Sequence, residues 1–319
     1  MDEPSQQDTG PADPRSLARS PAEPARPNAA QQDGERPENE RPRASGDVLA
    51  SAGPLEVRIA TDRADIEASQ ALRYQVFYQE MSAQPSLEMS ALRRDFDDFD
   101  KICDHLLVFD TAAPARPDGG AQVVGTYRLL RQDVADRHGG FYTAAEFDIT
   151  PFQARMHQGT RFLELGRSCT HKKYRTKPTI ELLWRGIMAY VARYGLDVMF
   201  GCASIEGTDP DRLAEPLSFL YHEYLAPEDW RVRALDDQFV DMHRLPPEGV
   251  NIRAALRALP PLIKGYIRAG AYIGDGAVVD RQFGTTDVLI IFPVSEINDR
   301  YFSRFAGEGA GREGQPSED

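Results

Sequence analysis

The residues best suited to chemistry lie within one apolar segment, in the sequence Glu164-Leu165-Gly166-Arg167. Charged side chains inside an apolar strand are costly unless they are paired. In a regular strand Glu164 and Arg167 would point to opposite faces, whereas a β-bulge at Leu165–Gly166 would bring them to one side and free backbone N–H groups. Such groups, beside an acid and a base, can stabilise the oxyanion that forms from a carbonyl group. A structural ion pair between Glu164 and Arg167 explains the same charges equally well.

A run of acidic residues, Asp95-Phe96-Asp97-Asp98-Phe99-Asp100, precedes this segment. Its four aspartates repel one another unless a cation is near. Asp97 and Asp100 therefore predict a seat for an ammonium group, and a solvated acidic loop is the alternative. The run lacks the glycine and the terminal glutamate of an EF-hand calcium loop.

Three further residues complete the candidate set. Arg73 and Phe77 are four residues apart and would share one face of a helix. Arg128 follows Gly125-Thr126-Tyr127 in a predicted strand. Taken alone, Arg73 fits equally well as an arginine that snorkels over the surface of an amphipathic helix.

The periodicity of apolar residues predicts the elements that must position these side chains. Strands are expected at residues 57–60, 105–109, 123–130, 161–169, 198–204, 239–243 and 288–292. Helices are expected at residues 63–81, 179–194, 213–224 and, as a basic helix, 251–268. Because strands and helices intermix, the fold class is α/β with a mixed sheet.

Composition limits the remaining classes. The net charge of −13 argues against binding to nucleic acid. The three cysteines form no CxxC pair, so the sequence predicts reduced thiols and no metal site. No apolar run reaches the roughly 20 residues that span a bilayer, and no signal peptide is recognisable, which together predict a cytoplasmic protein. Residues 1–54 hold nine of the 23 prolines and predict a disordered leader, 55–305 a single domain, and 306–319 a disordered tail.

Taken as a set, these motifs resemble the functional residues of acyl-homoserine-lactone autoinducer synthases, whose fold is related to the GNAT acyltransferases. The sequence is more similar still to the ornithine Nα-acyltransferases of ornithine-lipid synthesis, over about residues 55–302. The segments that carry this resemblance are Leu72-Arg73-Tyr74-Gln75-Val76-Phe77, Asp104-His105-Leu106-Leu107-Val108, Glu164-Leu165-Gly166-Arg167-Ser168, Lys264-Gly265-Tyr266, Asp275-Gly276-Ala277 and Thr285-Thr286-Asp287-Val288. The resemblance implies a GNAT-like mixed β-sheet flanked by helices, with a C-terminal extension.

It also implies a reaction in which the α-amine of ornithine attacks a 3-hydroxyacyl thioester, giving lyso-ornithine lipid. Glu164 would be the base that deprotonates the amine. Arg167 or Arg128 would bind the substrate carboxylate, while Asp97 and Asp100 would seat an ammonium group. In many GNAT enzymes a tyrosine at the place of Tyr221 protonates the leaving thiolate.

The expected acyl donor is acyl carrier protein, which presents the acyl group on its phosphopantetheine arm, and no bound cofactor is expected. The stretch at residues 171–178, ahead of the long helix, is basic but lacks the glycines that wrap the pyrophosphate of coenzyme A. Acyl carrier protein is acidic, so basic side chains are candidates for its docking. These are Lys172, Lys173, Arg175, Arg253, Arg257, Lys264 and Arg268.

Several alternatives stay open at this point. An autoinducer synthase would use the same residues on S-adenosylmethionine. A non-enzymatic protein of the membrane surface would need the basic helix but not Glu164, and the enzyme itself could contact the inner membrane surface through that helix. Cys169 could accept an acyl group, although a cysteine on an apolar strand is more often part of the core. A single acylation is expected, so that the product carries one acyl group.

Overall fold

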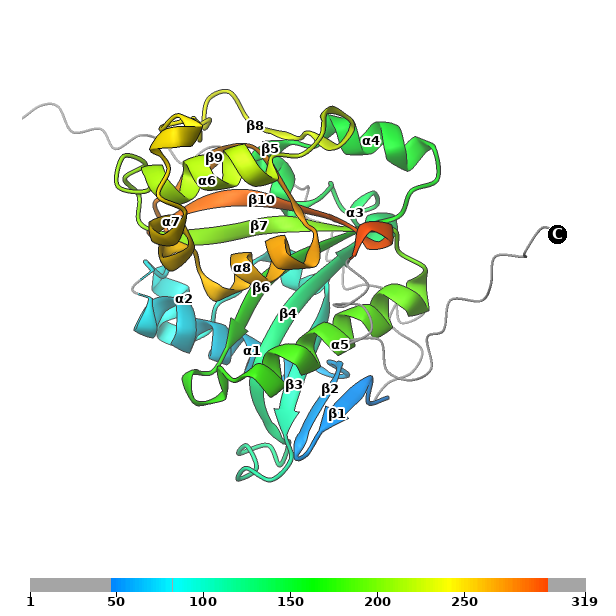
Figure 1. Cartoon of the computed structure of the whole chain (residues 1–319). Coiled ribbons are helices and arrows are strands. Elements are labelled where there is room, and N and C mark those ends of the chain that lie inside the picture. Colours follow the sequence, from blue (N-terminus) through cyan, green and yellow to red (C-terminus); the bar gives the residue numbers. More distant parts are fainter. Residues whose placement is uncertain (1–46, 82, 298–319) are drawn as a thin grey trace, which may run out of the picture. The chain divides into compact units, whose positions relative to one another are not determined.

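The computed structural model describes residues 47–81 and 83–297, which form one mixed sheet with helices on both faces (Figure 1). The ten strands lie in the order β1-β2-β3-β4-β6-β7-β10-β9-β8-β5. They are β1 (Ala50–Ala52), β2 (Leu55–Ile59), β3 (Asp104–Asp110), β4 (Gln122–Arg131), β5 (Phe147–Asp148), β6 (Phe162–Thr170), β7 (Val198–Glu206), β8 (Arg233–Ala234), β9 (Tyr272–Asp280) and β10 (Thr285–Pro293). The α-helices are α1 (Arg63–Tyr74), α2 (Leu87–Leu92), α3 (Gln132–Ala135), α4 (Thr150–His157), α5 (Lys177–Tyr194), α6 (Ala214–Tyr224), α7 (Ile252–Ala258) and α8 (Pro261–Ala269).

The centre of the sheet contains a short parallel pairing. Strands β6 and β7 are joined by the crossover helix α5 and pair only from Phe162–Glu164 to Val198–Phe200. Beyond this point β6 continues along β4, and β7 pairs over its whole length with β10. Gly201 lies at the point of separation, where an added Cβ would be 2.2 Å from the carbonyl oxygen of Leu165. The two central strands therefore diverge after three residue pairs.

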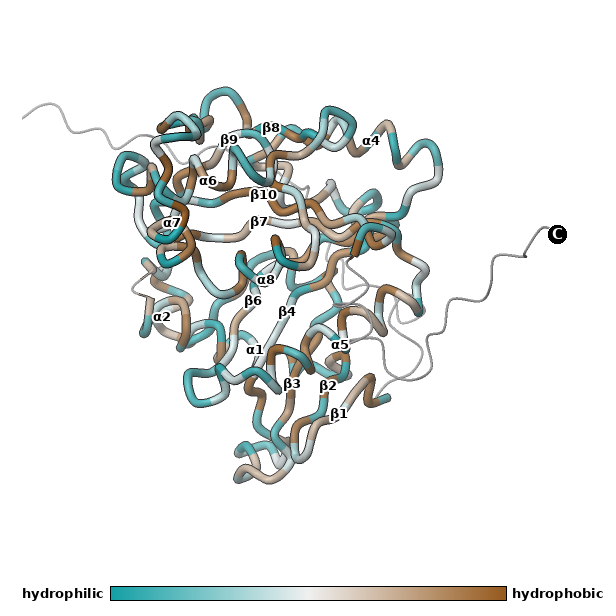
Figure 2. Tube along the Cα trace, viewed as in Figure 1, coloured by the Kyte–Doolittle hydropathy of each residue, from teal (hydrophilic) through white to brown (hydrophobic). Residues whose placement is uncertain are grey.

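Side chains that alternate along the strands build a separate core on each face. On one face α5, α6 and α8 cover a core that includes Leu129, Leu165 and Met199. On the other face α4 and neighbouring loops cover Phe162 and Phe200, and α1 covers a smaller cluster. Figure 2 shows the apolar residues gathered on the strands and the polar ones on the surrounding loops.

Most of the elements expected from periodicity are confirmed, and the central strands and long helix end within a few residues of their predicted bounds. The expected helix over residues 63–81 is α1 followed by a π-helical segment, Gln75–Glu80. The structure also contains β9, which the sequence reading missed because Gly274 and Gly276 interrupt its apolar pattern.

Two expectations are wrong. Residues 239–243 form no strand, and only Val240 makes an isolated bridge, to Ala277. Residues 50–52 lie in the predicted leader but form β1, paired with β2. The basic helical stretch at 251–268 is present as two helices, α7 and α8, which are separated at Pro260 and Pro261 as these prolines lead one to expect. The rest of that leader, residues 1–46, and the predicted tail at 306–319 lie outside the described residues.

Within residues 47–81 and 83–297, none of the helices is long and apolar enough to cross a bilayer.

Candidate active site

The expected bulge is present on β6, slightly further along the chain than predicted. Thr126 pairs with Cys169 and Arg128 with Gly166, so one residue of β4 faces two residues of β6, Arg167 and Ser168. Arg167 has a φ of 49°, a left-handed conformation that is uncommon for a residue other than glycine. Strained backbone of this kind is often found where a protein positions groups for function.

A cleft opens beside this bulge, in the space left by the divergence of β6 and β7. Backbone groups of β6 beyond Glu164 are outside the parallel ladder and face this space. Its walls are mainly apolar and come from four strands and α8. The lining residues are Tyr127, Leu165, Gly166, Arg167, Ser168, Met199, Phe200, Gly201, Cys202, Leu262, Tyr266, Ile290 and Phe292. Apolar walls beside the backbone of the bulge suit the carbonyl end of an acyl chain.

A buried network of ion pairs anchors the acidic run beneath the bulge. The guanidinium of Arg73, which is 0% exposed, donates to the carboxylates of Asp95 at 2.7 Å and Asp100 at 2.6 Å. Gln70 also donates to Asp100, and the hydroxyl of Tyr78 donates to Asp95 at 2.9 Å. Arg73 thus holds the aspartate loop against α1, and the snorkelling alternative is wrong.

The other two predicted arginines meet the same loop. Arg128 donates to Asp97 at 2.5 Å and to Asp100 at 3.3 Å, and Arg167 donates to Asp97 at 3.2 Å. Although burial opposes ionisation, Arg128 and Arg167 lower the pKa of Asp97, and Arg73 lowers that of Asp100. The structure therefore brings together five charged residues of the candidate set: Arg73, Asp97, Asp100, Arg128 and Arg167. Because the two aspartates already bind guanidinium groups, their role as an ammonium seat stays a prediction.

Glu164 lies on the other side of the bulge and is 4% exposed. Its carboxylate accepts hydrogen bonds from the backbone N–H groups of Tyr142 at 2.9 Å and Thr143 at 2.6 Å. Burial raises the pKa of Glu164, and these N–H groups oppose that shift. Glu164 accepts from amides while Arg167 pairs with aspartates, so the alternative of an ion pair between them is wrong. Glu164 also holds the turn that leads directly to Glu146.

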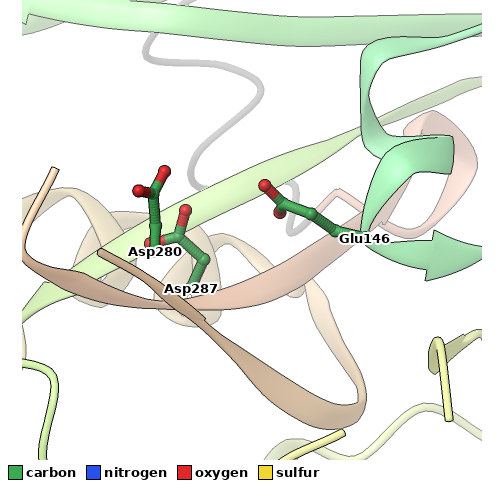
Figure 3. Close-up of side chains that lie close together, drawn as sticks. All are labelled: Glu146, Asp280 and Asp287. Atoms are coloured by element: carbon green, nitrogen blue, oxygen red, sulfur yellow. The ribbon is translucent and has the colours of Figure 1, made fainter. Parts of the chain in front are cut away.

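Three carboxylates converge close to the cleft, in a cluster that the sequence reading missed. Figure 3 shows Glu146 reaching towards Asp280 and Asp287, and their oxygen atoms lie within 4.8 Å of one another. The thiol of Cys202, which lines the cleft, donates to Glu146 at 3.2 Å. We call these three residues the carboxylate cluster.

The environment of the carboxylate cluster disfavours negative charge. Burial, followed by the charge of Asp287, raises the pKa of Glu146 to about 7. Burial also raises the pKa of Asp287 to about 6, against hydrogen bonds from Ser204 and Thr285. The signal in the sequence is an acid, Asp287, inside the apolar strand Thr285–Pro293. Asp280 ends the neighbouring strand β9, whereas Glu146 comes from a distant segment.

The two aromatic residues of the candidate set, Phe77 and Tyr221, lie in different parts of the structure. Phe77 packs edge-on against Phe283, whose ring lies 5.0 Å from the guanidinium of Arg167. Tyr221 instead stacks on His243 and is not among the residues that line the cleft, so its role as an acid stays a prediction. The tyrosines that do line the cleft are Tyr127 and Tyr266.

Cys169 is 7% exposed and packs in the core beside α1. Burial raises the pKa of its thiol to about 12, so the thiol stays protonated at neutral pH. Its reading as a core residue is confirmed.

The basic residues expected to dock a carrier lie on three elements. Lys172, Lys173 and Arg175 are exposed beside the start of α5, although Arg175 also pairs with Glu80 at 2.6 Å. Lys264 is half-buried, and its ammonium group caps α7 by donating to the carbonyl of Leu256 at 3.1 Å. The basic residues of α7 and α8 that are exposed are Arg253, Arg257 and Arg268.

A ten-stranded mixed sheet whose central parallel strands diverge beside a bulge defines an acyltransferase of the GNAT class. In agreement, the acetyltransferase (GNAT) domain family matches residues 72–185. The chain is 52% identical over 272 residues to the L-ornithine N(alpha)-acyltransferase of Rhizobium meliloti (strain 1021), which covers 85% of this chain and 90% of the relative. It is 48% identical over 272 residues to the enzyme of the same name from Agrobacterium fabrum (strain C58 / ATCC 33970), with coverages of 85% and 92%. The chain belongs to the L-ornithine N(alpha)-acyltransferase family.

Among solved structures, the chain is similar to FeeM, an N-acyl amino acid synthase from uncultured soil microbes. The TM-score is 0.43 at 9% identity, over 78% of this chain and 94% of that one. This likeness is too distant to support an inference about function.

The carboxylate cluster predicts a pH dependence of stability. Between about pH 4 and the raised pKa values of about 6 and 7, the folded protein holds protons on Asp287 and Glu146 that the unfolded chain has released. The free-energy contribution of these groups to folding therefore falls as the pH rises through this window. Glu146→Gln and Asp287→Asn remove the charge, so urea unfolding should show each variant gaining about 1–3 kcal/mol on the wild type between pH 4.5 and pH 8. The control is Asp98→Asn, at an exposed position, whose free energy of unfolding should differ from that of the wild type by the same amount at every pH. If the differences for Glu146→Gln and Asp287→Asn were equally independent of pH, the raised pKa values of Glu146 and Asp287 would be contradicted.

Proposed function

We propose that this enzyme transfers an acyl group onto the α-amine of ornithine, forming an amide. The names of its relatives point to ornithine, and the carboxylate cluster is the observation that carries the proposal for this chain. Ornithine differs from neutral amino acids by a second ammonium group at the end of its side chain. Three partly or fully buried carboxylates next to a cleft, two of which (Glu146 and Asp287) have raised pKa values, are suited to receive such a cation.

The two ends of ornithine then have separate partners. Among the three buried arginines the side chain of Arg167 is the most exposed, at 16%, against 4% for Arg128 and 0% for Arg73. Arg167 is therefore our candidate for the α-carboxylate, which it would bind by a two-pronged contact. With the side-chain ammonium in the carboxylate cluster, the α-amine lies between them, beside the bulge and the cleft.

Asp287→Asn should raise the KM for ornithine about ten- to a hundredfold, because loss of a charge-assisted contact costs roughly 1.5–3 kcal/mol. Norvaline, which lacks the side-chain ammonium, should be a poor substrate for the wild type and be equally poor for the variant. Steady-state kinetics with both amino acids test this, with Asp98→Asn as the matched surface control. An unchanged KM for ornithine would refute the ammonium site. Loss of wild-type activity in EDTA would assign the cluster to a metal ion, and turnover of S-adenosylmethionine in place of ornithine would refute the proposed acceptor.

We propose Glu164 as the base that removes the proton of the attacking amine. Its raised pKa suits proton transfer, and backbone N–H groups at the bulge would bind the oxyanion. In the reaction the amine nitrogen bonds to the thioester carbon, the C–S bond breaks, and the thiolate leaves as a thiol after taking up a proton.

Glu164→Gln should lower kcat by about 10²-fold or more, the usual scale for loss of a general base. Because Glu164 also holds the turn before Glu146, the measurement should include KM for ornithine and the melting temperature. A loss of kcat with both of these preserved supports the base. A higher KM with near-normal kcat would instead make Glu164 a positioning residue for the carboxylate cluster.

For the donor we propose a 3-hydroxyacyl group on acyl carrier protein, so that the product is lyso-ornithine lipid. The exposed arginines of α7 give an otherwise acidic protein a local positive surface. A negatively charged carrier, or an anionic membrane surface, would be attracted there.

Arg253→Glu with Arg257→Glu should weaken use of the carrier-protein donor severalfold or more, and more strongly at low salt than at high salt. Kinetics with an acyl-pantetheine thioester serve as the control, because this short donor has no surface to dock. Equal loss on both donors would indicate a folding defect. Unchanged activity with both donors would mean that these arginines do not bind the carrier protein and instead face an anionic membrane surface or solvent.

A further inference from the structure

The cleft contains a polar feature that amide formation does not require. Its wall on the α5 and α8 face is apolar, with Leu165, Met199 and Phe292 among its residues. Two phenol groups interrupt this wall, and the hydroxyls of Tyr127 and Tyr266 lie 3.2 Å apart. They are 3% and 5% exposed. The bond between the two hydroxyls uses only part of their hydrogen-bonding capacity, so the pair is suited to bind a polar group on the ligand of this cleft.

The hydrogen-bonding capacity of this pair matches an alcohol. One hydroxyl donates to the other, which leaves one phenol proton and several lone pairs for a third group. Burial raises the pKa of both tyrosines, so both remain neutral donors at physiological pH. The hydroxyl of Ser168, which also lines the cleft, opposes the shift of Tyr127 by a hydrogen bond. An alcohol both donates and accepts, whereas a carboxylate or an ammonium group does only one of these.

Both rings are held in place by the core. Trp184 packs edge-on against Tyr266 at 5.4 Å between ring centroids. Tyr127 projects from β4 at the position opposite the bulge, where the thioester carbonyl would bind. The phenol pair is therefore fixed close to the reacting end of the acyl chain, which fits a hydroxyl on one of the first carbons beyond the carbonyl.

We propose that Tyr127 and Tyr266 recognise the 3-hydroxyl group of the acyl donor and so select 3-hydroxyacyl chains over unsubstituted ones. This inference rests on the proposed acyl transfer to ornithine and adds the residues that read the donor. An unsubstituted chain would not use the remaining hydrogen-bonding capacity of the phenol pair, which favours the 3-hydroxyacyl donor over it.

The test compares 3-hydroxyacyl and unsubstituted acyl-pantetheine thioesters of equal chain length, with ornithine as the acceptor. The wild type should prefer the 3-hydroxyacyl donor by about tenfold or more in kcat/KM, the scale of an unmade buried hydrogen bond. Tyr266→Phe and Tyr127→Phe should bring this ratio close to one, because kcat/KM should fall further for the 3-hydroxyacyl donor than for the unsubstituted donor. Tyr224→Phe, outside the cleft, is the matched control and should keep the wild-type ratio.

Two results would overturn the proposal while leaving acyl transfer to ornithine intact. One is a wild-type ratio near one, or a ratio that neither phenylalanine variant changes. The other is an equal loss of kcat on both donors with an unchanged melting temperature, which would make the tyrosine a proton donor to the thiolate. Failure of the wild type to acylate ornithine with any donor would instead refute the proposed function itself.

Discussion

The parallel ladder between β6 and β7 ends after three residue pairs, and most of the site depends on that early end. Continued pairing would satisfy the backbone of both strands and close the sheet. At the end of this ladder the two strands are in close contact, because an added Cβ on Gly201 would lie 2.2 Å from the carbonyl oxygen of Leu165. The bulge at Arg167 then turns backbone groups towards the opening. The sheet thereby holds a slot between its two faces instead of a continuous barrier.

The two faces beside this slot have different chemistry. The face covered by α5 and α8 is apolar apart from a few hydroxyl groups, and suits a thioester with its alkyl chain. The opposite face holds the arginine–aspartate network, Glu164 and the carboxylate cluster, and suits a zwitterionic amine. Donor and acceptor can then approach the bulge from opposite sides, so that binding one does not obstruct the other.

Buried charges serve two different purposes in this arrangement. The network around Arg73 is closely matched in charge and hydrogen bonding, and removal of one partner would leave an uncompensated ion in the core. In the carboxylate cluster, by contrast, three acidic groups lie close together, and the pKa values of Glu146 and Asp287 are raised. Such an arrangement weakens the folded state by itself and becomes favourable when a cation binds, which is typical of binding sites.

The sequence by itself determined the class of the protein and most of its elements. Apolar periodicity placed α5 and the central strands, because one buried face leaves a regular imprint on the chain. The two charged residues Glu164 and Arg167 in an apolar strand marked the site, since such charges need a structural or chemical reason. The periodicity failed to predict β9, whose apolar pattern is interrupted by glycines.

Only the tertiary structure decided which groups meet. Asp97 was expected to face an ammonium group, yet its neighbours are Arg128 and Arg167, from strands that follow it in the chain. Glu146 lies more than 130 residues before Asp280 and Asp287, which belong to one hairpin, and Tyr127 and Tyr266 are 139 residues apart. Periodicity records whether a side chain is buried, but its partners depend on strand order and register, which long-range pairing sets.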